Sequence, residues 1–151
     1  MLIVEHTFQA PVAMVWKVWT TPEFIQKWWG PGHFTAPVIK NDLREGGGYL
    51  FAMQGPDGRT SWNKGRYIEI IPQKKIAATM SFADELGAII PASQLGIPGQ
   101  WPEEILWATL FDARGDTTHV TVTLDGVPPE MTEMARLGWM QQMEKLDPLM
   151  V

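Results

Sequence analysis

The sequence contains no cysteine. Disulfide bonds, thiolate catalysis and cysteine-ligated zinc sites are therefore excluded. The absence agrees with a cytoplasmic protein, which is the location that we expect. The three histidines, His6, His33 and His119, lie far apart in the sequence and lack the spacing of a metal motif. We therefore expect no metal and no other cofactor.

Basic residues are also few. The chain has 12 Lys and Arg against 17 Asp and Glu, a net charge of −5, and only Lys74 and Lys75 are adjacent. The basic residues therefore form no stripe that could bind nucleic acid. No apolar stretch approaches the ~18 residues that suggest a membrane-spanning helix, and the N-terminus lacks the pattern of a signal peptide. We expect a soluble protein that binds neither nucleic acid nor membrane.

Tryptophan and methionine, in contrast, are abundant, with 8 and 9 among 151 residues. Burying one Trp removes ~150–250 Å² of surface, or ~4–6 kcal/mol gross. Bulky rings leave irregular gaps, which flexible Met side chains commonly fill or line. The length predicts one domain, residues 1–151, with a substantial core.

The first part of the chain predicts a strand and two short helices. Residues 2–9 alternate apolar and polar side chains, as a strand does. Residues 12–19 place apolar side chains at i, i+3, i+4 and i+7, which indicates one face of a helix. Thr21 suits an N-cap and Pro22 the first turn of a second helix, which ends before Gly30.

From Ala36 onward the apolar period changes to two. The pattern predicts six more strands, at residues 36–41, 48–54, 60–71, 75–83, 104–112 and 118–126. Short turns such as Pro56-Asp57-Gly58 make most pairings antiparallel. The connection 84–102 is different, because it holds three Pro and three Gly. We expect it to form a flexible rim or lid.

The chain ends in a long helix predicted over residues 129–146. Its apolar face carries Met131, Ala135, Gly138, Trp139, Gln142, Met143, Leu146 and Leu149. Leu137 and Met140 lie off this face. They are either exposed or packed on the connection 84–102 or on a second subunit, which leaves a homodimer open.

Seven short motifs now stand in order along nearly the whole chain. They are Ala10-Pro11 with Val15-Trp16, Thr21-Pro22-Glu23, Trp28-Trp29-Gly30-Pro31, Asp42-x-Arg44-x-Gly46-Gly47, Pro56-Asp57-Gly58, Gly65-x-Tyr67-x-Glu69-Ile70-x-Pro72 and Gly138-Trp139. This order resembles the SRPBCC superfamily, also described as START-like or Bet v 1-like. Within it the chain is most similar to the activator-of-Hsp90-ATPase-homologue-like branch, which includes the calicheamicin-resistance protein.

The resemblance implies an α+β helix-grip fold. In this fold a seven-stranded antiparallel sheet wraps around a long C-terminal helix, with two short helices after the first strand and a deep hydrophobic cavity inside. Lipid carriers, plant hormone receptors, polyketide cyclases and co-chaperones all belong to the superfamily. The fold therefore does not fix one activity.

We expect the cavity to bind a hydrophobic or aromatic small molecule. The residues predicted to line it are Trp28, Met53, Trp62, Tyr67, Glu69, Met80, Phe82, Trp107, Trp139, Gln142 and Met143. Trp62 and Tyr67 share a face only if a bulge lies between them. Glu69 and Gln142 are polar in apolar surroundings, so each needs a partner from the protein, water or a ligand.

Two other functions are alternatives. The resemblance implies a Hsp90-type co-chaperone or protein-interaction role with a chaperone as partner. A cyclase or hydrolase would need Asp42, Arg44, His33 or Glu69 to converge in the cavity. Asp42 and Arg44 point to the same side of an extended segment. They form either part of a polar site or a structural ion pair. No Gly-x-Ser-x-Gly motif occurs, and we favour a protein that is not an enzyme.

Overall fold

The computed structural model describes residues 1–150 and contains one seven-stranded antiparallel sheet. The strands are β1 (Leu2–Phe8), β2 (Thr35–Asn41), β3 (Gly48–Gln54), β4 (Thr60–Ile71), β5 (Lys75–Ala83), β6 (Ile105–Arg114) and β7 (Thr117–Asp125). Their order in the sheet is β1-β7-β6-β5-β4-β3-β2. Strands β2 to β7 thus each pair with their neighbours in sequence, and β1 joins the sheet beside β7.

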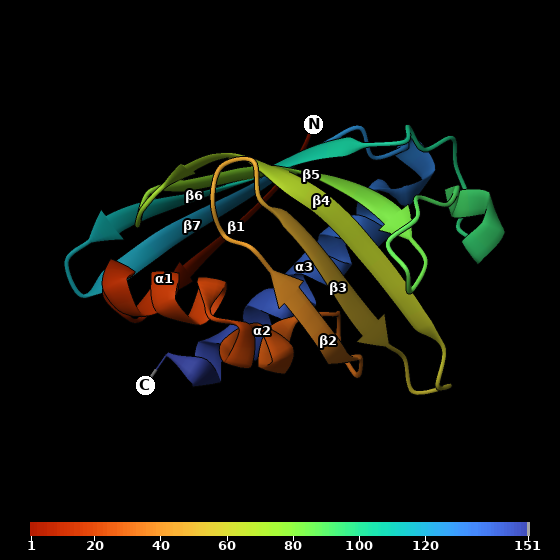
Figure 1. Cartoon of the computed structure of the whole chain (residues 1–151). Coiled ribbons are helices and arrows are strands. Elements are labelled where there is room, and N and C mark those ends of the chain that lie inside the picture. The colour runs from red at the N-terminus through yellow and green to blue at the C-terminus, as the bar shows by residue number, and fades with distance from the viewer. Residues whose placement is uncertain (151) are drawn as a thin grey trace.

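Three helices lie on the concave side of this sheet. They are α1 (Val12–Thr20), α2 (Pro22–Trp28) and α3 (Thr132–Leu146). Figure 1 shows the strands arching over α3, with α1 and α2 side by side below the sheet. The expected α+β helix-grip fold is confirmed. No helix within residues 1–150 combines the length and apolarity needed to cross a membrane.

The predicted C-terminal helix begins later than expected. Residues Pro129–Met131 form a 3₁₀ turn, closed by the N–H of Met131 on the carbonyl of Pro128 at 2.9 Å. The α-helix itself starts at Thr132. A short 3₁₀ turn of this kind is frequent at the N-terminus of an α-helix.

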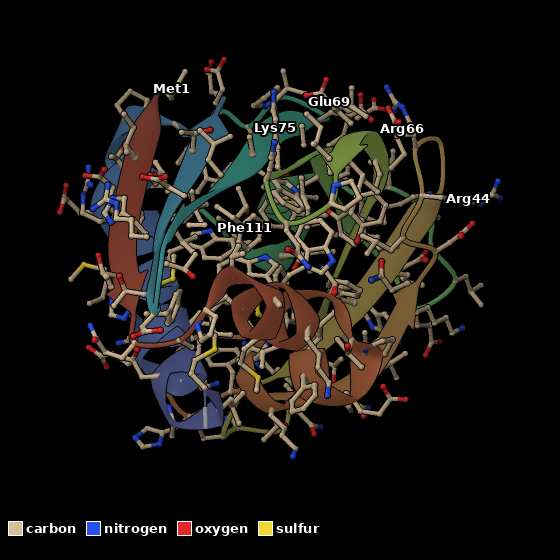
Figure 2. The ribbon with its side chains drawn as sticks, turned by 90° about the vertical axis from the view of Figure 1, so that its left-hand side faces the viewer. Met1, Arg44, Arg66, Glu69, Lys75 and Phe111 are labelled. Carbon is tan, nitrogen blue, oxygen red and sulfur yellow. The ribbon has the colours of Figure 1, made fainter. Side chains whose placement is uncertain are left out.

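Alternating side chains of the sheet build the core against the helices. On β7, Val120 and Val122 are fully buried and face inward. Phe111 of β6 packs edge-on against Trp16 and Trp19 of α1, with ring centroids 5.2 and 5.6 Å apart. Figure 2 shows Phe111 between the sheet and the α1 ribbon. The apolar period of two therefore gives the sheet its core face.

A β-bulge in β4 reverses the facing of the residues that follow it. The register with β5 is the same at Trp62 and at Tyr67, and it shifts between Tyr67 and Glu69. Asn63 and Tyr67 are therefore buried on the inner side, whereas Trp62 has the opposite parity and is half-buried. Beyond the bulge, Ile70 pairs with Ile76 of the core and Glu69 turns outward.

A cavity between the sheet and the C-terminal helix

A cavity of about 370 Å³ lies between the inner face of the sheet, α2 and α3. The helices and the segments that follow them contribute Trp19, Trp28, Trp29, Pro31, Ala135, Gly138, Trp139 and Gln142 to its wall. The sheet contributes Asn41, Tyr49, Phe51, Met53, Asn63, Tyr67, Ile76, Met80, Phe82, Ile105, Trp107 and Leu124. Aromatic and methionine side chains therefore dominate the wall.

Four tryptophans form one aromatic cluster at the helical side. Trp19 and Trp139 lie parallel within 8°, with centroids 6.2 Å apart. Trp28 packs on Trp19 at 5.1 Å, and its Nε1 donates to the carbonyl of Val18 at 3.0 Å. Trp29 packs edge-on against Phe51 and Trp139. Its buried Nε1 has no hydrogen-bond partner among residues 1–150.

The two tyrosines of the chain anchor the sheet side of the cavity. The hydroxyl of Tyr49 donates to the carbonyl of Thr79 at 2.7 Å and accepts from Trp107 Nε1 at 3.1 Å. Burial raises the pKa of Tyr49 well above its ordinary value, although the Trp107 hydrogen bond lowers it. Burial likewise raises the pKa of Tyr67, whose hydroxyl donates to Asn41 Oδ1. Both phenols are therefore neutral at physiological pH.

The position of the Tyr49 ring requires glycine at position 65. A Cβ on Gly65 would lie 2.5 Å from Tyr49 Cε2 and 1.9 Å from the carbonyl oxygen of Thr79. Real Cβ atoms do not approach backbone oxygen so closely. Gly65 therefore lets the Tyr49 ring come close to β4, while its hydroxyl reaches Thr79 of β5.

The polar residue of α3 in the cavity wall is Gln142, whose exposed fraction is only 5%. Its Oε1 accepts from the backbone N–H of Gly30 at 2.7 Å. Gly30 has a φ of 91° and begins the turn after α2. One turn further along α3, Lys145 donates to the carbonyls of Gly30 and Phe34 at 2.6 and 2.8 Å. Helix α3 thus fixes the turn that carries Trp29 and Pro31.

As far as the structure describes it, the wall of the cavity carries no formal charge. No Asp, Glu, Lys, Arg or His side chain is among the described residues that line it. An ionised ligand in this place would lose its hydration without gaining a counter-ion. The cavity is therefore suited to an uncharged, largely apolar molecule.

The connection between β5 and β6 contributes Ile97 and Trp101 to the rim. Trp101 packs edge-on against Phe82 at 5.1 Å, and its Nε1 donates to the carbonyl of Pro98 at 2.9 Å. A short 3₁₀ helix at Ala92–Leu95 lies within the same connection. The predicted rim thus borders the cavity, and its mobility stays a prediction.

This architecture matches a known family. The model of the family described as activator of Hsp90 ATPase homolog 1-like protein matches residues 9–150. The chain belongs to this family. Among curated proteins, none matches the sequence significantly.

Several solved structures have the same fold. A crystal structure of a Chromobacterium violaceum protein has a TM-score of 0.81 at 24% identity, covering 99% of this chain and 95% of that one. A solution structure of an Arthrobacter aurescens protein has a TM-score of 0.81 at 24% identity, over 98% and 84% of the two chains. The AHSA1 protein of Silicibacter pomeroyi has a TM-score of 0.79 at 16% identity, over 97% and 94%. At these identities the likeness extends to the fold alone.

In this family member, most of the residues predicted for the cavity lie in its wall. They are Trp28, Met53, Tyr67, Met80, Phe82, Trp107, Trp139 and Gln142. Sequence reasoning missed Asn63, whose Nδ2 contacts Met80 Sδ at 3.2 Å. Asn63 could have been found because it lies four residues before Tyr67 and so shares its face of the strand. Trp62, the large apolar neighbour, was predicted for the lining instead.

Three predicted residues lie elsewhere, which corrects the expected lining. Trp62 faces outward because the β4 bulge follows Tyr67 instead of preceding it. Glu69 faces outward because of the same bulge and pairs with Lys75 at 2.7 Å. Figure 2 shows this pair at the outer rim of the sheet. Met143 is buried on a neighbouring side of α3 and packs in the core without lining the cavity.

The polar residues considered for catalysis do not meet in the cavity. Asp42 and Arg44 form an exposed ion pair at 2.8 Å, which is the structural alternative. His33 is exposed on the turn after α2. Among residues 1–150, no cluster of three or more His, Asp or Glu is arranged to hold a metal ion.

A second hollow, of about 660 Å³, lies on the outer face of the sheet and is more open. It is bordered by Lys40, Lys64 and Arg66. Lys64 already donates to the carbonyl of Gly87 at 2.7 Å, and Arg66 pairs with Glu104 at 2.8 Å. With these two cations engaged, the outer hollow is a weaker candidate site than the aromatic cavity.

Proposed function

We propose that this protein binds an uncharged aromatic small molecule in the cavity between the sheet and α3. The observation that carries the proposal is the tryptophan cluster of Trp19, Trp28, Trp29 and Trp139 in a wall without formal charge. Aromatic rings offer large, flat contact areas to a planar ligand. The volume of about 370 Å³ lies within the usual range of ligand pockets, ~300–1,000 Å³.

Methionine side chains support the same proposal. Met53 and Met80 come from the sheet, and Met131 and Met134 from the start of the C-terminal helical segment. Unbranched and polarisable, they repack around ligands of different outline. We expect a preference for a class of flat apolar molecules over one particular shape.

A titration with N-phenyl-1-naphthylamine, an uncharged aromatic probe, tests the proposal. Its emission should rise on binding to the wild-type protein. Ala135→Trp fills the cavity from α3 and should lower the affinity at least tenfold. Leu137→Trp is the matched control, because Leu137 lies on the same helix with 52% exposure. Equal binding by both variants, or no binding by the wild type, would refute the proposal.

A Hsp90-type co-chaperone role is the second candidate. It is supported by the family description and by an exposed apolar row on α3, where Met134, Leu137 and Met140 are 64, 52 and 47% exposed. A partner protein would cover this row. The measurement is the ATPase rate of a Hsp90 protein with and without the wild type, and with Leu137→Glu as control. An unchanged rate would remove this candidate.

A further inference from the structure

The amide group of Gln142 has only one orientation that fits its surroundings. The backbone N–H of Gly30 is a donor and contacts the side-chain oxygen of Gln142 at 2.7 Å. An amide nitrogen cannot accept this hydrogen bond. The oxygen is therefore held at Gly30, and the Nε2 group, with its two N–H donors, occupies the other position.

This Nε2 group has no acceptor in the part of the chain that the structure describes. Among residues 1–150, the hydrogen bond of the Gln142 side chain involves its oxygen alone. Among the described residues, the side-chain nitrogen and oxygen atoms that are fully covered and lack a hydrogen-bond partner are Trp29 Nε1 and Thr109 Oγ1. Gln142 Nε2 is not one of them, so it keeps some accessible surface. Because Gln142 lines the cavity and is otherwise buried, the remaining accessible surface of Nε2 faces the cavity.

We infer that Gln142 determines specificity: the aromatic ligand carries an uncharged oxygen acceptor, such as a ketone, ester or ether, that accepts from Gln142 Nε2. This inference rests on the proposed function. A pure hydrocarbon would remove water from the amide and leave both donors unpaired, which costs affinity. A carboxylate would pay the full cost of burying a charge in a wall without cations. A neutral oxygen pairs one of the two donors and brings no charge into the cavity.

Two matched pairs of probes test the inference: 9-fluorenone with fluorene, and 2-acetylnaphthalene with 2-ethylnaphthalene. Members of a pair have similar outlines and differ in the carbonyl. Equilibrium dialysis gives the affinity ratio of ketone to hydrocarbon for each pair. Substitution of Gln142 should lower this ratio about five- to tenfold for at least one pair, the value of a single hydrogen bond. The ratio cancels the general loss of affinity that a distorted cavity would cause.

Two variants keep the test independent of folding. Gln142→Glu retains an oxygen for the Gly30 N–H and, as the carboxylate, has no donor in place of Nε2. Gln142→Met removes both hydrogen-bonding groups at similar length. Gln141→Glu, one residue away and outside the cavity wall, is the control and should keep the wild-type ratio.

The results separate the inference from the proposed function. A lowered ratio in both Gln142 variants supports the inference. Wild-type binding of all four probes, with ratios in both variants within twofold of the wild type, would overturn it and leave the proposed function standing. Failure of all four probes to bind the wild type would overturn the proposed function, and the inference with it.

Discussion

Lys145 of α3 donates through Nζ to the backbone carbonyl of Gly30 at 2.6 Å, across 115 positions of the sequence. The same ammonium group reaches the carbonyl of Phe34 at 2.8 Å. Partial burial lowers the pKa of Lys145. This contact, with the Gln142 hydrogen bond one turn earlier, holds the turn after α2 against the C-terminal helix. The position of Trp29 in the cavity wall therefore depends on α3.

Replacing Lys145 by Met should lower the free energy of unfolding by about 1–2 kcal/mol. Met keeps the aliphatic stem but removes two charge-assisted hydrogen bonds to backbone carbonyls. Urea unfolding followed by Trp fluorescence gives the value. Lys74→Met is the control, because Lys74 is exposed and should change stability by less than about 0.5 kcal/mol. Equal effects of the two substitutions would show that the Lys145 contacts add nothing to stability.

Gly65→Ala should destabilise the protein by about 3 kcal/mol or more, or prevent folding. The added Cβ would meet the Thr79 carbonyl at 1.9 Å and the Tyr49 ring at 2.5 Å, so strand and ring must move apart. Gly48→Ala, on the adjacent strand, is the control because its Cβ would meet only the Gly65 carbonyl at 3.4 Å. Chemical unfolding of both variants measures the difference. A cost below about 1 kcal/mol for Gly65→Ala would contradict the packing described here.

Local signals in the sequence were sufficient for most strands. The bounds of β3, β4 and β5 agree with the predicted ranges, because turn residues such as Pro56-Asp57-Gly58 mark the strand ends chemically. Gln142 could be predicted for the cavity because a polar residue interrupts an otherwise apolar helical stripe. Such features depend on residues close together in the chain.

The misplaced residues depend on pairing between strands. The register shift after Tyr67 is a property of the β4–β5 pair, and no residue near Ile68 marks it. The parity of Glu69 therefore could not be deduced from β4 alone. The contacts of Gly30 with Gln142 and Lys145 likewise join distant segments and follow from no local pattern.

The two tyrosines should remain protonated until the protein unfolds in alkali. Burial raises the pKa of both phenols above the ordinary value of about 10. The folded state then keeps protons that the unfolded state releases, so stability is full below about pH 10 and falls as the pH rises further. The lowered pKa of Lys145 acts in the opposite direction, because the unfolded state keeps a proton that the folded state releases, but it involves one proton at most. The tyrosines therefore dominate.

The measurement is absorbance at 295 nm, which reports phenolate, together with near-ultraviolet circular dichroism. Because the chain has only 2 Tyr, no background from exposed phenols is present. We expect the phenolate signal to appear in the same transition as the loss of circular dichroism, above pH ~10. Tyr67→Phe should halve its amplitude. Phenolate formation near pH 10 with unchanged circular dichroism would contradict the burial of these hydroxyls.

Gly138→Ala should raise the stability of the protein and lower the affinity of its cavity for a ligand. Gly138 lies in the interior of α3, where Ala is favoured over Gly by about 0.5–1 kcal/mol. The added Cβ would meet only Pro31, at an ordinary 3.7 Å, so no clash offsets this gain. Yet Gly138 and Pro31 both line the cavity, and a methyl group between them takes space from a ligand.

Urea unfolding and N-phenyl-1-naphthylamine titration of the same variant measure the two effects. Higher stability with weaker binding would show that the glycine preserves room for a ligand at the expense of helix stability. Higher stability with unchanged binding would instead assign Gly138 to the contact of α3 with the Pro31 turn.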